Sequence, residues 1–120
     1  MPAGLTTARG DSALVLTAQG AGTVTSGPID QSGAAGFVVL LVHCTAATGT
    51  SPTLNVTLEQ SATGTSGWAA ITGGAVAQLS GAGNALAFAA ASQPFVRVSA
   101  TVAGTTPAVT ATIAIIEFSD

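Results

Sequence analysis

The chain has very little charge. Only 6% of its 120 residues are Asp, Glu, Lys or Arg, against about 25% in typical soluble domains. It has no lysine, and its two arginines are Arg9 and Arg97. Because affinity for nucleic acid rests largely on Lys and Arg contacts to phosphates, this composition argues against a nucleic-acid partner. A surface with so few charges is poorly suited to a free monomer, so we expect much of it to be hidden in an assembly.

Residue types that carry chemistry are scarce as well. The chain has one histidine, one cysteine, one tryptophan and no tyrosine. His43 and Cys44 are adjacent, but a zinc site needs three or four ligands, and neighbouring strand residues point to opposite faces. We interpret Cys44 as a buried core residue and His43 as a polar-partnered or interface residue. We therefore expect no catalytic residue, no metal, no cofactor and no small-molecule substrate, and hence no enzyme.

Long apolar runs are absent too. The longest, FVVLLV at residues 37–42, is far shorter than the ~20 residues that a helix needs to cross a bilayer, so we expect no membrane partner. Three valines, the short length and the flanking Gly36 and Gly49 favour a strand over residues 37–44. Because this segment is apolar at both odd and even positions, we expect both of its faces to be covered.

A repeated segment is the clearest positive signal. Residues 49–58, GTSPTLNVTL, are echoed 55 positions later by residues 104–113, GTTPAVTATI. Each copy follows an apolar stretch and runs into alternating apolar and polar residues, a pattern that predicts a strand, a tight turn and a second strand. We therefore predict a repeated β-hairpin, with positive φ at the glycine of each turn and both turns at a common end of the molecule. The predicted turn residues are Gly49, Pro52, Gly104 and Pro107.

The remaining patterns are also those of β-structure. In residues 54–59 apolar side chains alternate with polar ones, which is typical of a strand with one buried face. The alanine-rich segment 85–91 is compatible with a helix, but its larger apolar residues alternate and its surroundings are β, which favours a strand. We predict an all-β fold of about eight short strands, an antiparallel two-sheet sandwich or a jelly-roll-like barrel. Residues 1–12 are predicted to form an extended N-terminal arm, and residues 13–120 a single β-sandwich domain.

Arg97 stands out among the few charged residues. It lies between Val96 and Val98, and strand alternation places its side chain on the face opposite to theirs, on the outside of the sandwich. Two alternatives follow. Arg97 faces solvent or binds a carboxylate of its own chain, or it forms an intersubunit contact with a neighbouring copy.

Three segments carry a resemblance to a known class of proteins: TAATGTSPTLNV at residues 45–56, FVRV at 95–98 and TVAGTTP at 101–107. They resemble small structural proteins encoded among the head genes of tailed bacteriophages. The resemblance covers residues 37–118, while the first 36 residues lie outside it. The chain departs from these proteins in its lower charge and in having Val96 where they carry an aromatic residue beside the arginine.

The resemblance implies a non-enzymatic virion component, above all a capsid decoration protein on the outside of the shell. Its partners would be the major capsid protein and further copies of itself, and its place would be the virion, assembled in the cytoplasm of the bacterial host. Two alternatives stay open at this point. One is another head–tail or fibre component, and the other is a β-sandwich module that binds carbohydrate or a bacterial surface.

Overall fold

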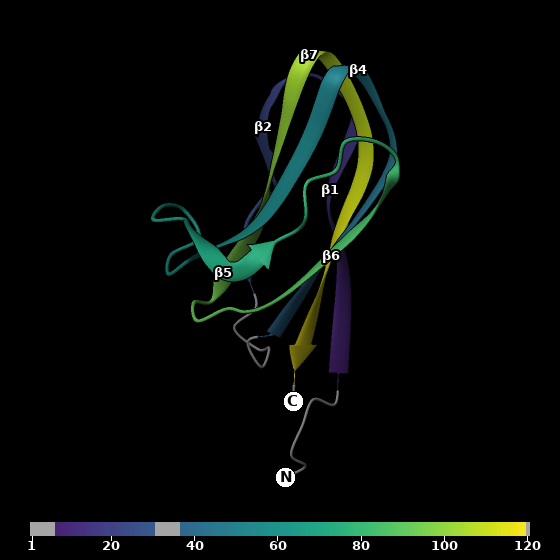
Figure 1. Cartoon of the computed structure of the whole chain (residues 1–120). Helices are drawn as coiled ribbons and strands as arrows, with labels where there is room; N and C mark the ends of the chain where they lie inside the picture. Colours follow the sequence, from purple (N-terminus) through teal and green to yellow (C-terminus); the bar gives the residue numbers. More distant parts are fainter. Residues whose placement is uncertain (1–6, 31–36, 120) are drawn as a thin grey trace.

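Two strands of 25 residues, β4 and β7, dominate the fold (Figure 1). The structure is a computed structural model, which describes residues 7–30 and 37–119. In this part of the chain there are seven strands and no helix, and therefore no helix long and apolar enough to cross a membrane. The strands are β1 (Thr7–Gln19), β2 (Gly22–Thr25), β3 (Ile29–Asp30), β4 (Phe37–Ser61), β5 (Ala69–Ala75), β6 (Gly83–Ala90) and β7 (Phe95–Ser119).

The long strands pair with each other in antiparallel fashion over nearly their whole length, from Val38 opposite Glu117 to Ser61 opposite Phe95. Each half of this ladder has its own neighbours. The first half of β4 pairs with β6, and the second half of β7 pairs with β1. The second half of β4 pairs with β5, and the first half of β7 pairs with β2 and β3. All strand pairs are antiparallel.

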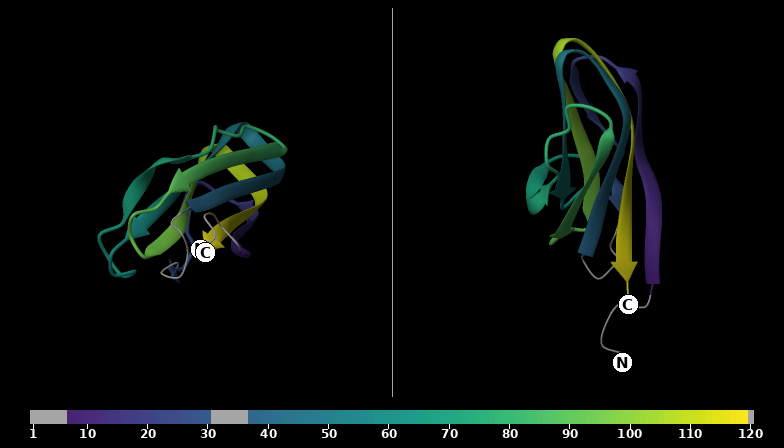
Figure 2. Two further views of the ribbon diagram at one scale, coloured as in Figure 1. Left: turned by 90° about the horizontal axis from the view of Figure 1, so that it is seen from below. Right: turned by 45° about the vertical axis from the view of Figure 1, so that its right-hand side comes forward.

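Both long strands bend in the middle, so this one sheet folds over on itself into two layers (Figures 1 and 2). The predicted all-β antiparallel sandwich is therefore confirmed, and the sheet is not a closed barrel. The strand lengths differ from the prediction. Predicted short strands, such as 37–44 and 54–59, are parts of the long strands. The predicted strand at 85–91 is present as β6.

The two copies of the repeat are these bends, and the predicted hairpins are wrong in this respect. After Gly49 the chain does not fold back on the segment before it but continues in the same strand, and Thr50 pairs with Thr105 of the other copy. The φ angles confirm the predicted glycine conformation, at 110° for Gly49 and 127° for Gly104. Both bends lie together at the top of Figure 1, which confirms the predicted common end.

The bends pack against each other reciprocally. A Cβ at Gly49 would lie 2.6 Å from the carbonyl oxygen of Thr106, and a Cβ at Gly104 would lie 2.9 Å from that of Ser51. Ser51 and Thr106 occupy the same place in the two copies and share a left-handed backbone, with φ of 51° and 44°. The repeat therefore generates a local two-fold pseudosymmetry in which each glycine allows the opposite bend to approach.

The inner faces of the two layers form one aliphatic core. Leu54, Val56 and Leu58 are buried as the alternation predicted, and Cys44 is 1% exposed, which confirms its interpretation as a core residue. The other large side chains that are almost completely buried are Leu16, Val38, Leu40, Val42, Val96, Val98, Val102, Val109, Ile113 and Ile115. Because valine and isoleucine suit a pleated surface and fill the space between sheets, this composition favours a sandwich without large aromatic side chains in its centre.

The N-terminal boundary differs from the prediction. Residues 7–12, assigned to an arm by the sequence pattern, lie in β1, whose backbone pairs with β7 from Thr7 opposite Ser119 onward. Residues 1–6 lie outside the described residues. The sheet thus begins before residue 13.

Candidate interaction surfaces

The outer surface of one layer is polar. It is formed by the second half of β4, the first half of β7 and the short strand β2. Side chains that alternate with the core residues point outward here, and we call this surface the polar face. Its members are Thr23, Thr25, Asn55, Thr57, Glu59, Arg97, Ser99 and Thr101. Hydrogen bonds link its side chains across strands, as between the hydroxyls of Thr23 and Thr101 at 3.0 Å.

Arg97 is engaged within its own chain on this face. It lies directly opposite Glu59, and its Nε donates to Oε1 of that carboxylate at 2.7 Å. Its guanidinium also lies over the ring of Trp68, with Cζ 4.4 Å from the ring centroid. Both ionic side chains are less than a quarter exposed. This is the first of the two arrangements considered for Arg97, and an additional intersubunit contact stays a prediction.

A capped loop positions Trp68. Ser61 is completely buried, and its Oγ accepts hydrogen bonds from the backbone N–H groups of Thr63 and Gly64, at 3.1 and 3.0 Å. The same hydroxyl donates to the carbonyl oxygen of Ser66. Gly64 lies against the ring of Phe95, where a Cβ would approach ring atoms to 3.0 Å. These contacts hold the loop between β4 and β5 in one conformation, so the indole is presented at a defined place beside Arg97.

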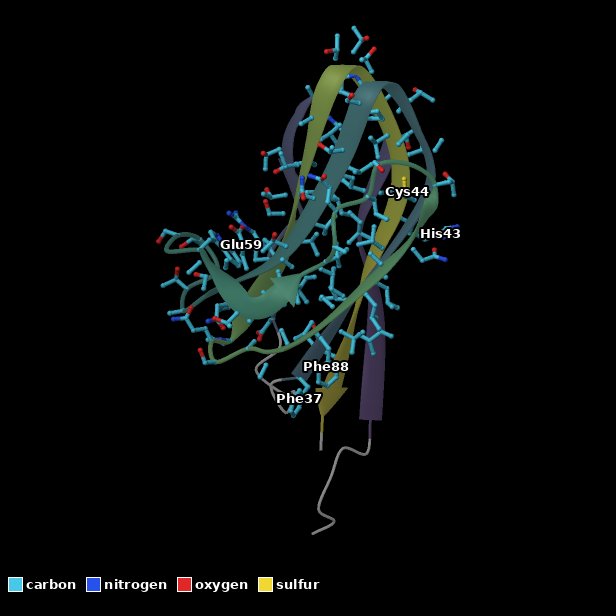
Figure 3. The ribbon with its side chains drawn as sticks, viewed as in Figure 1. Phe37, His43, Cys44, Glu59 and Phe88 are labelled. Carbon is cyan, nitrogen blue, oxygen red and sulfur yellow. The ribbon has the colours of Figure 1, made fainter. Side chains whose placement is uncertain are left out.

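The outer surface of the other layer is apolar. It is formed by the first half of β4, the second half of β7 and β6, and we call this surface the apolar face. Its members are Phe37, Val39, Leu41, Leu86, Phe88, Ala114 and Ile116. The rings of Phe37 and Phe88 stack with centroids 5.3 Å apart, and Figure 3 shows them together at one end of this layer.

The expectation that residues 37–44 are covered on both faces is wrong for the described structure. Phe37 is 39% exposed and Leu41 is 36% exposed, whereas the intervening Val38 and Leu40 are completely buried. On β6, Leu86 is 63% exposed and Phe88 is 59% exposed. The reason is architectural: one face of this layer packs on the other layer, and no described element lies over its outside.

A groove of about 450 Å³ lies on the apolar face, toward the end away from the phenylalanine pair. Its walls come from β4, β6 and β7, and its lining residues are Leu41, Val42, His43, Asn84, Ala85, Leu86, Thr112 and Ala114. At its far end Nδ1 of His43 is hydrogen-bonded to Oδ1 of Asn84. His43 is exposed while Cys44 is buried, so the two neighbours point to opposite faces as predicted. Among the described residues, no three His, Cys, Asp or Glu side chains gather in one place.

The structure thus brings the four predicted turn residues together at one end and places Arg97 on the polar face. Sequence reasoning missed the apolar face. Its signal was present, because Leu86 and Phe88 alternate with alanines on β6, and Phe37 and Leu41 share a strand face. What the pattern could not show is that these alternating sets lie on adjacent strands and both point outward.

No family model matches the chain, and no curated protein matches it. Among solved structures, it is similar to the PBSX exported protein XepA, with a TM-score of 0.63 and 12% sequence identity. The similarity covers 94% of this chain and 37% of XepA, so the chain spans little more than a third of that protein's length. At this level of identity the likeness shows a shared fold and nothing further.

Two further solved structures resemble the chain with TM-scores below 0.5, which are too low to support a conclusion about this protein. One is to the CBM22-1-GH10 modules of the xylanase Xyn10B from Clostridium thermocellum, solved with xylohexaose, with a TM-score of 0.49, 13% identity, and coverage of 74% of this chain and 17% of that one. The other is to the Pam1 cyanophage capsid asymmetric unit, with a TM-score of 0.37, 17% identity, and coverage of 94% and 85%.

Proposed function

We propose that this chain is a non-enzymatic structural protein of a tailed-bacteriophage virion, and specifically a decoration protein that binds the outside of the capsid shell and stabilises it. The observation that carries the proposal is a surface suited to protein contact. One outer face exposes phenylalanine and leucine, and the other exposes short hydroxyl and amide side chains. The head-protein resemblance of residues 37–118 supports the same reading.

The placement of charge adds support. On the polar face Glu59 and Arg97 neutralise each other, and Glu117 is 2% exposed in the other layer. Contacts made by such a surface depend little on long-range charge, so they are only weakly screened by salt. A shell protein profits from this property, because a virion meets media of very different ionic strength.

The stabilising effect of a decoration protein follows from thermodynamic linkage between its binding and the assembly of the shell. A protein that binds the assembled shell, and not its separate subunits, shifts the equilibrium toward the assembled state by mass action. Each contact can be small, because a closed symmetric shell repeats it many times and a bridging molecule benefits from high effective concentration. The partners in this proposal are the major capsid protein and further copies of the chain itself, in a virion assembled in the bacterial cytoplasm.

The test is the number of copies in a purified particle. Quantitative mass spectrometry against labelled peptides of the chain and of the major capsid protein would measure this ratio. We expect on the order of a hundred copies or more, because every symmetry-related site on the shell is equivalent. A count of roughly a dozen, as a ring at one vertex would supply, would show a head–tail or fibre component instead.

A second candidate function is a carbohydrate-binding module, and Trp68 is the observation that favours it. A partly exposed indole beside hydrogen-bonding side chains is a suitable platform for a sugar ring, and Trp68 lies against Arg97, which is paired with Glu59. Arg97 already covers one face of the ring, which leaves less of it for a sugar. Glycan-array binding that saturates and is lost in Trp68→Ala, with Trp68→Phe retaining part of it, would favour this candidate over the decoration role.

A further inference from the structure

The apolar face has the size and composition of a binding surface. The exposed fractions of Phe37 and Phe88, 39% and 59%, add to nearly one whole phenylalanine, and those of Leu41 and Leu86, 36% and 63%, to nearly one whole leucine. Together these four side chains present about 400 Å² of contiguous apolar surface, within the range that is often functional on a monomer. This is about half of the ~800 Å² that each partner contributes to a standard protein interface.

The lack of charged side chains on the apolar face restricts which kind of partner can bind there. Among the described side chains, none on this face or lining its groove is acidic or basic apart from His43. A partner with charged residues at the contact would leave those charges desolvated without a counter-ion, which is costly. The surface that meets it must therefore be uncharged and apolar, and the apolar face of a second copy has these properties.

Shape favours the same occupant. The stacked pair of Phe37 and Phe88 lies at one end of the face, and the groove lies toward the other end, near His43 and Asn84. If two copies meet face to face about a two-fold axis, the phenylalanine pair of each faces the groove of the other. Such an interface is isologous: one surface carries both the projection and the recess, and the two contacts are identical.

We propose that two copies of this chain associate through their apolar faces, with the Phe37–Phe88 pair of one copy in the groove of the other. The rim of the interface would then be formed by His43, Asn84 and Thr112, which supply polar groups at its edge as in other protein interfaces. The proposal also accounts for the run of apolar residues at 37–42, because the second copy covers the face that the chain's own fold leaves open.

Sedimentation equilibrium of the purified full chain tests the proposal. We expect a dimer of the 11.4 kDa chain that dissociates on dilution. Leu86→Glu places a charge in the contact and should raise the dimer dissociation constant by about 100-fold or more. The residue is 63% exposed in the monomer, so the variant should fold, as circular dichroism would check. A milder variant, Leu86→Ser, removes apolar area alone and should weaken the dimer by about tenfold.

Two controls match these variants. Thr25→Glu puts the same charge at an exposed strand position on the polar face, and it should leave the dissociation constant within about threefold of wild type. Leu86→Met keeps size and apolarity and should do the same. A wild-type chain that stays monomeric at about 100 μM, or a dimer that Leu86→Glu leaves intact, would overturn the proposal.

The result is separable from the proposed function. Self-association is measured on the purified chain, whereas decoration is measured by the copy number on particles. Suppose that the wild-type chain is monomeric and binds to particles assembled without this protein, whereas the Leu86→Glu variant does not bind to them. In that case the apolar face contacts the shell. That outcome would overturn the dimer and leave the decoration role standing. If the chain is a dimer but a particle holds only a few copies, the dimer proposal stands and the decoration role is overturned.

Discussion

The two layers of the sandwich are built from equivalent pieces, yet their outer surfaces are opposite in character. Each layer contains one half of β4 and one half of β7, and the 55-residue repeat relates the bends that join the layers. The pairs next to the bends follow this symmetry: Thr48 lies opposite Ala108 in one layer and Thr53 opposite Ala103 in the other. Inward-facing residues are mainly aliphatic in both. Outward-facing residues are Phe and Leu in one layer and Thr, Ser, Asn, Glu and Arg in the other.

The comparison separates what the fold needs from what it leaves free. Packing between the layers requires similar aliphatic side chains on both inner faces, and the bends require glycine at both equivalent positions. Nothing in the fold requires the outer faces to match. Selection for contacts with partners can therefore act on the outer faces. Figure 3 shows one residue of each layer, His43 and Glu59, on opposite sides of the molecule.

The largest loss of stability should come from replacing the glycines at the two equivalent bends. Gly49→Val and Gly104→Val each force a branched residue into positive φ and bring a Cβ into contact with backbone atoms of the other bend. We expect each to lower the free energy of unfolding by about 3 kcal/mol or more, with Gly49 the more sensitive because its contact is shorter. Urea denaturation measures this change.

Gly20→Val is the matched control, since a Cβ at Gly20 would have no atom within 4 Å. It should change the free energy of unfolding by about 0.5 kcal/mol or less. If Gly104→Val were no worse than this control, the two bends would not be equivalent and the pseudosymmetry would be only apparent.

A buried hydroxyl is specific to the polar layer. Ser61→Ala would leave the N–H groups of Thr63 and Gly64 without their side-chain acceptor and should cost about 1–3 kcal/mol. It should also loosen the loop that carries Trp68, so the indole emission should shift toward that of a solvated ring. Thr65→Ala, at an exposed position of the same loop, is the control. Unchanged stability together with unchanged fluorescence would show that the loop does not depend on this hydroxyl.

The ion pair of the polar layer should have a smaller effect. A double-mutant cycle of Glu59→Gln and Arg97→Met measures the coupling between the two side chains, and we expect about 0.5–1 kcal/mol because both are partly exposed and screened by solvent. The coupling should fall in about 1 M salt, where the Debye length is near 3 Å. A coupling near zero would mean that the polar face gains nothing from its charges and that Arg97 is available to a neighbouring subunit.

The prolines of the bends should have the smallest effect. Pro52→Ala and Pro107→Ala act mainly by giving the unfolded chain more freedom and should each cost about 0.5–1 kcal/mol. Pro107 is buried and Pro52 only half-buried, so Pro107→Ala should lie at the upper end of that range. Thermal unfolding of the two variants side by side would measure the difference. A larger loss than at the glycines would contradict the view that backbone conformation and close approach dominate the bends.

Part of the fold could be predicted from residue patterns alone. Alternation identified Leu54, Val56 and Leu58 as the inner face of a strand, and β-branched residues favoured a strand at 37–44. The hairpins could not be distinguished from bends in this way. A Gly-Thr-Ser-Pro segment is compatible with either, and the choice depends on whether the chain after it pairs with the preceding segment or with the other copy of the repeat.

For the candidate surfaces, strand alternation put Arg97 on the outside, but its bonding to Glu59 and Trp68 joins residues that are 38 and 29 positions away in the sequence. The exposure of Leu41 is a similar case. Apolar residues at every position of a strand indicate that both faces are to be covered, but they do not say whether the cover belongs to the same chain. In the described structure no element lies over the outer side of Leu41.

The sequence by itself determined the all-β class, the aliphatic core, the sparse charge and the two equivalent turns, because these follow from side-chain periodicity, composition and local backbone preferences. Only the tertiary structure decided that the two turns are bends of paired long strands, and that one layer presents an apolar surface and the other a polar one. The physical reason is that strand pairing joins segments through backbone hydrogen bonds that most residues can make. Side chains determine which face of a strand is buried, but the partner strand is selected by the packing of the whole chain.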